Sequence, residues 1–317
     1  MRLNLPIQEA VDGCSSVLIA GMGGGFDVFC GLPLYFELRE KGAAVHLASF
    51  SFSDIASYRG GVELSETLKG VGRTARERTV YFPELYLAQW LAGAMHEDVP
   101  IWSFQKTGGG PLLRDYRVLR EHLHLDCIIL VDGGVDSLVH GDEPATGTLI
   151  EDATSLFAVN ELTEVPLRLL CCVGLGAEPD LTYYHIFENI ARLTEIGGFR
   201  GSCSLAPDMR SYQLCEEAVR YVQGMPLQDP SVINSSIVSA VRGHYADYHM
   251  TEKTSGSRLW ISPLMGICWF FDLPTVAKQN LYLPRLAGTE TFMDAMMAYM
   301  TSAGVLPRKP WERIPLP

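Results

Sequence analysis

The chain has 317 residues and a formal net charge of −12, and 47% of its residues are hydrophobic. A chain of this length and apolar content can build one large domain or two smaller ones. The negative charge disfavours binding to nucleic acid or to an anionic membrane. The N-terminus lacks the apolar region of a signal peptide, and every apolar stretch is well short of the roughly 20 residues of a membrane span. We therefore expect a cytoplasmic protein without nucleic-acid or membrane partners, and a homo-oligomer stays open.

Cysteine usage points to a reduced protein. The chain has eight cysteines and no C-x-x-C pair, and several cysteines lie inside apolar runs. This pattern is typical of buried free thiols and disfavours a disulfide framework or a zinc knuckle.

Strand-like and helix-like segments alternate through the first two thirds of the chain. Strands are predicted at 16–20, 44–52, 99–104, 127–131 and 165–173, and helices at 32–41, 83–96, 112–124, 148–162 and 181–196. Residues 53–82 are polar and rich in arginine, so we expect a long excursion or lid there rather than core. The alternation predicts a Rossmann-like α/β fold, with a doubly wound, mainly parallel sheet and helices on both faces.

The alternation of strand-like and helix-like segments is less regular after Gly197. We expect helices at 208–223, 231–248 and 289–301, and one or two strands at 258–271. The methionines of the last helix (Met293, Met296, Met297 and Met300) are expected to fill gaps in the core. The predicted organisation is a Rossmann-like ligand-binding region at 1–198 and a more helical α+β region at 199–317, which could equally complete one larger domain.

A glycine-rich loop follows the first strand. Its candidate ligand-binding residues are Gly21, Gly23, Gly24, Gly25 and Asp27. A strand, a glycine turn and a helix together favour phosphate binding, because backbone N–H groups can approach the anion closely. The alternative is a tight turn that needs glycine only for close packing of helix against sheet.

The same loop disfavours a nicotinamide dinucleotide as cofactor. The G-x-G-x-x-G fingerprint would need glycine where Phe26 stands, and Ser49 to Phe52 supply no acidic residue at the end of the second strand. A second spacing, from Gly23 to Pro33, loosely resembles the glycine-rich loop of sirtuin-like NAD-binding folds, although Asp27 replaces the serine of that pattern.

An acidic segment begins where the apolar run 127–131 ends. Its candidate catalytic residues are Asp132, Asp136 and Glu143, and its candidate ligand-binding residues are Gly133, Gly134 and Asp142. Carboxylates crowded at a strand end repel one another, so such a cluster favours a bound cation, a sugar hydroxyl or a proton transfer. Asp132 and Asp136 are candidate ligands of Mg²⁺ or Ca²⁺. The alternative is that these acids accept backbone N–H bonds at turns, cap the next helix or are solvated.

Weaker candidates surround these two motifs. The loop at 108–111 could extend a phosphate cradle, and Lys106 could meet a phosphate or be an ordinary surface lysine. Arginines 73, 76 and 78 could close over an anion or form a solvated face. Glu178, at the end of another strand, is a candidate for the same rim.

The two motifs together resemble the family called domain of unknown function 1152. Its first motif, G-x-G-G-G-x-D after a strand, is matched by Gly21, Gly23, Gly24, Gly25 and Asp27. Its second motif, V-D-x-G-x-D-x-L-x-x-G-D-E, is matched by Val131, Asp132, Gly134, Asp136, Leu138, Gly141, Asp142 and Glu143, with Asp152 as a later aspartate. The likeness is vague beyond residue 200. It implies a Rossmann-like α/β fold and brings no activity with it.

These observations predict an enzyme, a hydrolase or transferase, that acts on a phosphorylated or nucleotide-like small molecule. The glycine loop would hold phosphate, and the acids would bind ribose or a divalent cation, with Asp132, Asp136 or Glu143 as the base. Two alternatives stay open: a non-catalytic nucleotide-binding or sensing protein, and an NAD(P)-dependent oxidoreductase.

Overall fold

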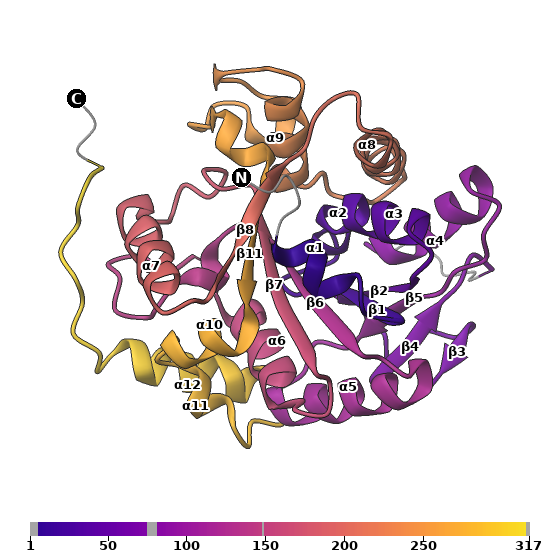
Figure 1. Cartoon of the computed structure of the whole chain (residues 1–317), viewed down its shortest axis with the longest axis horizontal. Helices are drawn as coiled ribbons and strands as arrows, with labels where there is room; N and C mark the ends of the chain where they lie inside the picture. Colours follow the sequence, from indigo (N-terminus) through magenta and orange to yellow (C-terminus); the bar gives the residue numbers. More distant parts are fainter. Residues whose placement is uncertain (1–5, 75–80, 148, 315–317) are drawn as a thin grey trace.

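A large sheet forms the centre of the molecule (Figure 1). The structure, a computed structural model, describes residues 6–74, 81–147 and 149–314. Within these residues the sheet has nine strands in the order β3-β4-β5-β2-β1-β6-β7-β11-β8, and β9 and β10 form a separate pair. The strands are β1 (Ser16–Gly21), β2 (Ala44–Phe50), β3 (Val62–Glu63), β4 (Leu68–Val71), β5 (Ile101–Phe104), β6 (Cys127–Gly133), β7 (Leu167–Val173), β8 (Phe199–Ser204), β9 (Ala246–Asp247), β10 (Trp260–Ile261) and β11 (Ile267–Asp272).

Helices cover both faces of the sheet. They are α1 (Pro6–Val11), α2 (Asp27–Cys30), α3 (Leu32–Glu40), α4 (Pro83–Ala94), α5 (Gly109–Leu123), α6 (Ile150–Glu161), α7 (Tyr183–Glu195), α8 (Arg210–Gln223), α9 (Val232–Val241), α10 (Leu273–Gln279), α11 (Leu283–Leu286) and α12 (Phe292–Ala303). Short 3-10 helices span Asp136–Leu138 (η1), Glu252–Thr254 (η2) and Pro263–Gly266 (η3). Among the described residues, no helix is both long enough and apolar enough to cross a membrane.

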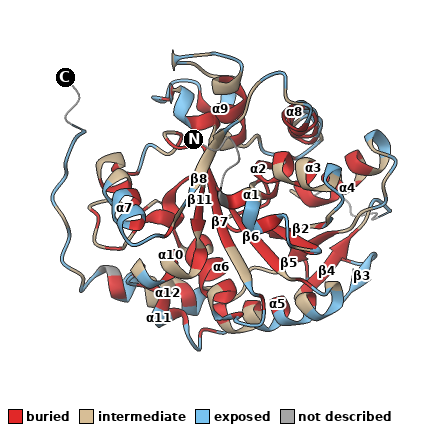
Figure 2. Ribbon diagram, viewed as in Figure 1, coloured by how far each residue is buried: buried red, intermediate tan, exposed pale blue. Residues whose placement is uncertain are grey.

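Alternation along the central strands builds the two sides of the core. In β1, Leu18 and Ala20 pack with α5, α6 and α7, whereas Val17 and Ile19 pack with α2, α3, α4 and α8. Successive side chains of a strand point to opposite faces, so a strand covered on both faces is apolar throughout. Figure 2 shows the resulting buried strands between helices whose outer surfaces are exposed. The predicted α/β class, with a large and mostly parallel central sheet, is confirmed.

The strand order turns at β1. The strands β5, β2, β1, β6 and β7 are mutually parallel, and β1 lies between β2 and β6. The chain therefore moves from β1 to β2 and β5 on one side, and then crosses to β6 and β7 on the other. Such a reversal leaves a crevice beyond the carboxyl ends of the two strands where the order turns. Here those ends are the glycine loop after β1 and the acidic segment after β6.

Two expectations about segments outside this centre are wrong. The stretch expected as an excursion contributes β4 to the sheet, paired antiparallel with β5, and Ile55, Tyr58 and Val71 pack in a small core there. The methionine-rich helix α12 exposes much of its length: Met293 and Met300 are each 59% exposed. Helical periodicity predicts a stripe of side chains, and it does not say whether another element covers that stripe.

The close approach of α2 to the end of β1 requires a residue without a side chain at Gly21. A Cβ at Gly21 would lie 2.4 Å from the backbone nitrogen of Val28, whereas a Cβ at Gly93 of α4 would meet nothing within 4 Å. We expect Gly21→Ala to lower the free energy of unfolding by about 1–3 kcal/mol through overpacking. The matched Gly93→Ala should raise it by about 0.4–1 kcal/mol. Urea unfolding of both variants checks this, and equal effects would contradict the packing argument.

Candidate functional site

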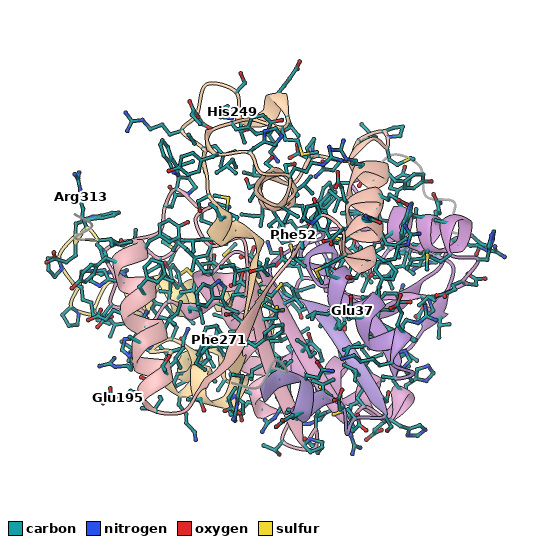
Figure 3. The ribbon with its side chains drawn as sticks, turned by 45° about the horizontal axis from the view of Figure 1, so that its top comes forward. Glu37, Phe52, Glu195, His249, Phe271 and Arg313 are labelled. Atoms are coloured by element: carbon teal, nitrogen blue, oxygen red, sulfur yellow. The ribbon has the colours of Figure 1, made fainter. Side chains whose placement is uncertain are left out.

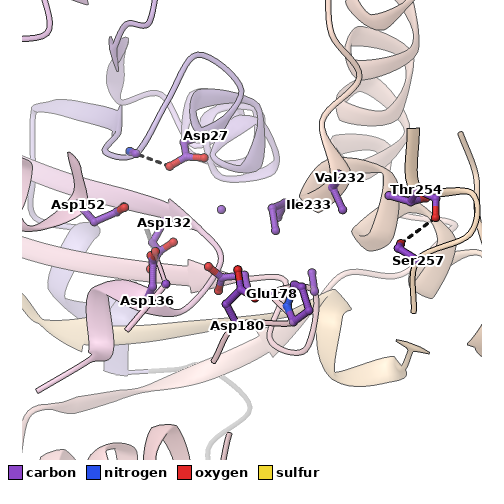
Figure 4. A pocket seen from close by; sticks show the side chains of 15 residues that line it. Asp27, Asp132, Asp136, Asp152, Glu178, Asp180, Val232, Ile233, Thr254 and Ser257 are labelled. Atoms are coloured by element: carbon purple, nitrogen blue, oxygen red, sulfur yellow. Dashed lines mark hydrogen bonds between the residues drawn. The ribbon is translucent and has the colours of Figure 1, made fainter. Parts of the chain in front are cut away.

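A cavity lies beyond the carboxyl ends of β1, β6 and β7. Its volume is about 410 Å³, and its lining includes six acidic side chains: Asp27, Asp132, Asp136, Asp152, Glu178 and Asp180. No lysine, arginine or histidine is among the described residues that line it. Figure 4 shows the acids gathered on one side of the space, with Val232 and Ile233 across from them.

Asp27 and the glycine loop form one wall of this cavity. The backbone N–H of Gly23 donates to Oδ2 of Asp27 over 2.8 Å, so the loop folds back onto the first turn of α2. A Cβ at Gly23 would lie 2.7 Å from Oδ1 of Asp152 and 2.8 Å from Oδ2 of Asp27. The absence of a side chain at Gly23 is therefore what lets these two carboxylates share the space.

Asp132 and Asp136 belong to the same acidic side of the cavity as Asp27, and they lie at the end of β6 and in η1. Both are buried and line the cavity, as the sequence predicted. Oδ2 of Asp132 accepts the backbone N–H and the hydroxyl of Ser137, which fixes the carboxylate and leaves Oδ1 for the cavity. Gly133 also lines the cavity, and Gly134 lies against the carboxylate of Glu178.

Asp152, in the first turn of α6, completes the acidic cluster. Its side chain is 3% exposed, and Oδ1 has no hydrogen-bond partner. One oxygen from each of Asp27, Asp132 and Asp152 lies within 4.8 Å of the others, and Asp136 is not part of this closest group. Within the described residues, this closest group differs from the pair of Asp132 and Asp136 expected from the sequence, whose role as metal ligands stays a prediction. Asp152 is buried in the cluster rather than solvated.

The pKa values of these acids reflect burial without counter-charge. Burial raises the pKa of Asp27 from 3.8 to about 7, and the nearby charge of Asp136 adds to the shift. Burial, followed by the charge of Asp27, raises the pKa of Asp132 to about 7. Burial and then the charge of Asp136 hold the pKa values of Asp152 and Glu178 well above their usual range. The protein alone therefore disfavours full ionisation of the cluster at neutral pH.

This cluster makes stability depend on pH. Because the folded pKa values of Asp27 and Asp132 lie above 3.8, these two carboxyl groups hold more protons in the folded chain than in the unfolded chain between about pH 4 and pH 7. Their contribution to stability should therefore fall as pH rises through this window. We expect the unfolding midpoint in EDTA to decrease from about pH 5 to about pH 8, and Asp132→Asn to flatten the decrease. A midpoint that rises with pH would contradict this; the exposed Asp208→Asn should keep the wild-type slope.

The structure does not bring Asp142 and Glu143 to the cavity. The Glu143 carboxylate is 1% exposed and accepts the backbone N–H groups of His140 and Gly141, at 2.8 and 2.7 Å, and the Asn189 side-chain amide at 2.6 Å. Asp142 lies 3.2 Å from the His140 ring and 3.4 Å from Lys309. Both acids stabilise a local bend. Their position does not support the expected role of Glu143 as a base or of Asp142 as a ligand-binding residue.

Glu143 should thus matter for stability and not for binding. Glu143→Ala leaves buried N–H groups without an acceptor, and each such group costs about 1–3 kcal/mol. We expect the free energy of unfolding to drop by at least about this amount, with ligand affinity unchanged in the folded protein. Denaturant unfolding and calorimetric titration measure the two quantities, and weakened binding at full folding would restore Glu143 to the site.

A second cavity adjoins the first on the other side of the glycine loop. Its volume is about 490 Å³, and the two cavities share Gly23 and Asp27. Gly24 and Gly25 line it, together with Phe52 and Lys253. Figure 3 shows Phe52 near the middle of the molecule and His249 at its top, on the segment before η2. Gly21 lines neither cavity and acts through packing instead.

The structure gives separate outcomes for the weaker ligand-binding candidates of the sequence. Gly109 and Gly110 lie in the first turn of α5, where their N–H groups already donate to Thr289, which favours the simple loop over an extended phosphate cradle. Lys106 lies 2.5 Å from Glu151 in an ion pair and over the ring of Phe52, and it is not itself among the lining residues of either cavity. Arg73 pairs with an exposed acid on the surface, and arginines 76 and 78 lie outside the described residues. The eight cysteines are free thiols and mostly buried, as expected.

Comparison with models of protein families finds one match, over residues 68–306, to "Protein of unknown function (DUF1152)". The chain belongs to this family. The match includes Asp132, Asp136 and Asp152, and it begins after the glycine loop. It confirms the predicted family through residues that include the second motif, and it extends the likeness well beyond residue 200. Comparison with curated proteins and with solved structures finds no match.

In this member of the DUF1152 family, sequence reasoning missed part of the site. Asp180 lies two residues after Glu178, and the wall opposite the acids comes from Val232, Ile233, Thr254 and Ser257. The wall is tied to the glycine loop through α9, where Asn234 donates to the carbonyl of Phe26 over 3.0 Å. These residues carry no recognisable motif. Only tertiary packing brings them to the acids.

Proposed function

We propose that this protein is an enzyme that acts on a phosphorylated or nucleotide-like small molecule by hydrolysis or group transfer. The observation that carries the proposal is the acid-lined cavity where the strand order turns, with the glycine loop as its shared wall. Its volume of about 410 Å³ is within the range of roughly 300–1,000 Å³ typical of small-molecule sites.

The order of the parallel strands supports the finer, Rossmann-like assignment. Numbered in chain order, the strands β5-β2-β1-β6-β7 read 3-2-1-4-5, which is the order of the doubly wound dinucleotide-binding fold up to its fifth strand. Ligands of that fold lie at the crevice beside its first strand. A fold of this kind hosts many chemistries, so the reaction itself has to be argued from the side chains.

The two adjoining cavities suit a ligand with two chemically different ends. On the second-cavity side, Gly24 and Gly25 offer backbone close to the ligand, and Lys253 supplies a cation, paired over 2.5 Å with Asp229. These features favour a phosphate. On the first-cavity side, the carboxylates favour hydroxyl groups or a cation, and Val232 and Ile233 add an apolar surface. A nucleotide or sugar phosphate combines such ends.

Asp136 is the best candidate for the base. It lines the cavity at 3% exposure, and its charge already raises the pKa values of Asp152 and Glu178. Asp132 is held rigidly by Ser137, which suits a residue that positions a ligand or a cation. In hydrolysis, Asp136 would take a proton from the attacking water as the bond to the leaving group breaks.

The Asp136 role predicts a split between binding and turnover. We expect Asp136→Asn to lower turnover by roughly 10²-fold to 10⁴-fold, the usual contribution of general acid–base catalysis, with ligand affinity within a few-fold of wild type. The exposed Asp208→Asn should leave both unchanged. Ligands come from a thermal-shift panel of nucleotides, sugar phosphates and nicotinamide dinucleotides, and turnover is followed by mass spectrometry. Unchanged turnover in Asp136→Asn would contradict the assignment.

The same panel separates the alternatives. Stabilisation by a nucleotide without turnover would favour a binding or sensing protein. Stabilisation by nicotinamide dinucleotides alone would favour an oxidoreductase, for which Phe26 and the missing acid at the end of β2 are unfavourable signs.

A further inference from the structure

We propose that Asp27, Asp132 and Asp152 form a site for one divalent cation of the Mg²⁺, Mn²⁺ or Ca²⁺ class. The inference deepens the proposed function, because it names the cofactor of the same cavity. Cation binding itself does not require the proposed function; only a catalytic role of the cation does. Its support is the spacing of the three carboxylates, the unpartnered oxygen of Asp152 and the absence of counter-charge.

The spacing fits a cation between the carboxylates. One oxygen from each residue lies within 4.8 Å of the other two. Two ligand oxygens on opposite sides of a cation are separated by twice the metal–oxygen distance. This oxygen–oxygen separation is about 4.2 Å for Mg²⁺ and about 4.8 Å for Ca²⁺. The three carboxylates can therefore bind one cation with small side-chain adjustments. The all-oxygen donor set favours these hard cations over zinc or copper.

Asp152 supplies the independent observation. Buried polar atoms are almost always hydrogen-bonded, and Oδ1 of Asp152 is an exception. Asp152 lines the cavity in the first turn of α6, and it lies beside Asp132 in Figure 4. An oxygen that is buried, unpaired and aimed at two other carboxylates is where a cation would bind.

Existing hydrogen bonds orient the other two ligands. Asp27 is held by the N–H of Gly23, and Asp132 is held by Ser137. Each carboxylate oxygen can accept a hydrogen bond and still bind a cation, and such second contacts commonly orient metal ligands. Within the described residues, no basic side chain makes an ion pair with any of the three acids. A bound cation would supply the missing positive charge.

The first test measures the cation directly. The full-length protein is stripped with EDTA and titrated with Mn²⁺, Mg²⁺ and Ca²⁺ by calorimetry, with electron paramagnetic resonance as a second readout for Mn²⁺. We expect about one cation per chain and a loss of affinity of at least about tenfold in Asp152→Asn. Asp208→Asn, an exposed aspartate changed in the same way, should bind as wild type does.

The second test uses the sign of a stability change. Without cation, Asp152→Asn removes a buried carboxyl group whose Oδ1 has no hydrogen-bond partner and that lies beside two other carboxyl groups, so its melting temperature should be no lower than that of stripped wild type. Added Mn²⁺ should raise the melting temperature of wild type and not that of the variant. A merely structural carboxylate would give the opposite sign in the stripped protein. Asp27→Asn replaces Asp152→Asn if the latter does not fold.

Two results would overturn the site: stripped wild type that binds none of the three cations at millimolar concentration, or Asp152→Asn that binds them as wild type does. Failure here is distinguishable from failure of the proposed function. Cation binding without turnover of any metabolite in the panel supports the site and contradicts the enzyme. Turnover that survives EDTA, with no cation bound, supports the enzyme and contradicts the site.

Discussion

The mutual repulsion of buried carboxylates is the constraint on which this molecule's candidate site depends. Asp27, Asp132 and Asp152 come from three separate elements and meet where the strand order turns, with no basic residue among the described lining. Burying one charge is costly, and burying several of the same sign adds their repulsion. Contacts elsewhere in the fold must offset this unfavourable free energy. One of them is a hydrogen bond from Ser155 of α6 to the carbonyl of Met22, which holds the helix against the end of β1.

The sequence predicted the centre of the fold because central parallel strands are apolar on both faces. The strands β1, β2, β6 and β7 each stand out as an apolar run. The outer strands do not. β4 reads Leu-Lys-Gly-Val, and its lysine is buried because Lys69 donates to the carbonyls of Ala56 and Tyr58. β8 carries two serines and an arginine. Tertiary contacts, rather than local pattern, make these segments strands.

The candidate site likewise contains residues that the sequence predicted and residues that only tertiary contacts assign. Asp27, Asp132 and Asp136 were found from the sequence because glycines and strand ends mark where backbone and acids meet. Glu143 belongs to the same motif, yet its bond partners, including Asn189, come from a helix that the motif does not reveal. Asp152 was noted in the sequence as an acid of the same stretch and as a later aspartate of a motif, and it was not assigned to the site. Motif membership identified the neighbourhood, and only the bonds of each acid separate a cavity residue from a structural one.

The position of β11 has a consequence for the order in which the sheet is assembled. Within the described residues, β8 pairs with the sheet through β11 alone, and β11 in turn pairs with β7. Residues 199–204 therefore leave the ribosome about sixty residues before the strand that joins them to the rest of the sheet. Until β11 is inserted, β7 presents an open edge and β8 has no partner. During synthesis, this side of the sheet should be the last to close and the one most open to wrong pairing.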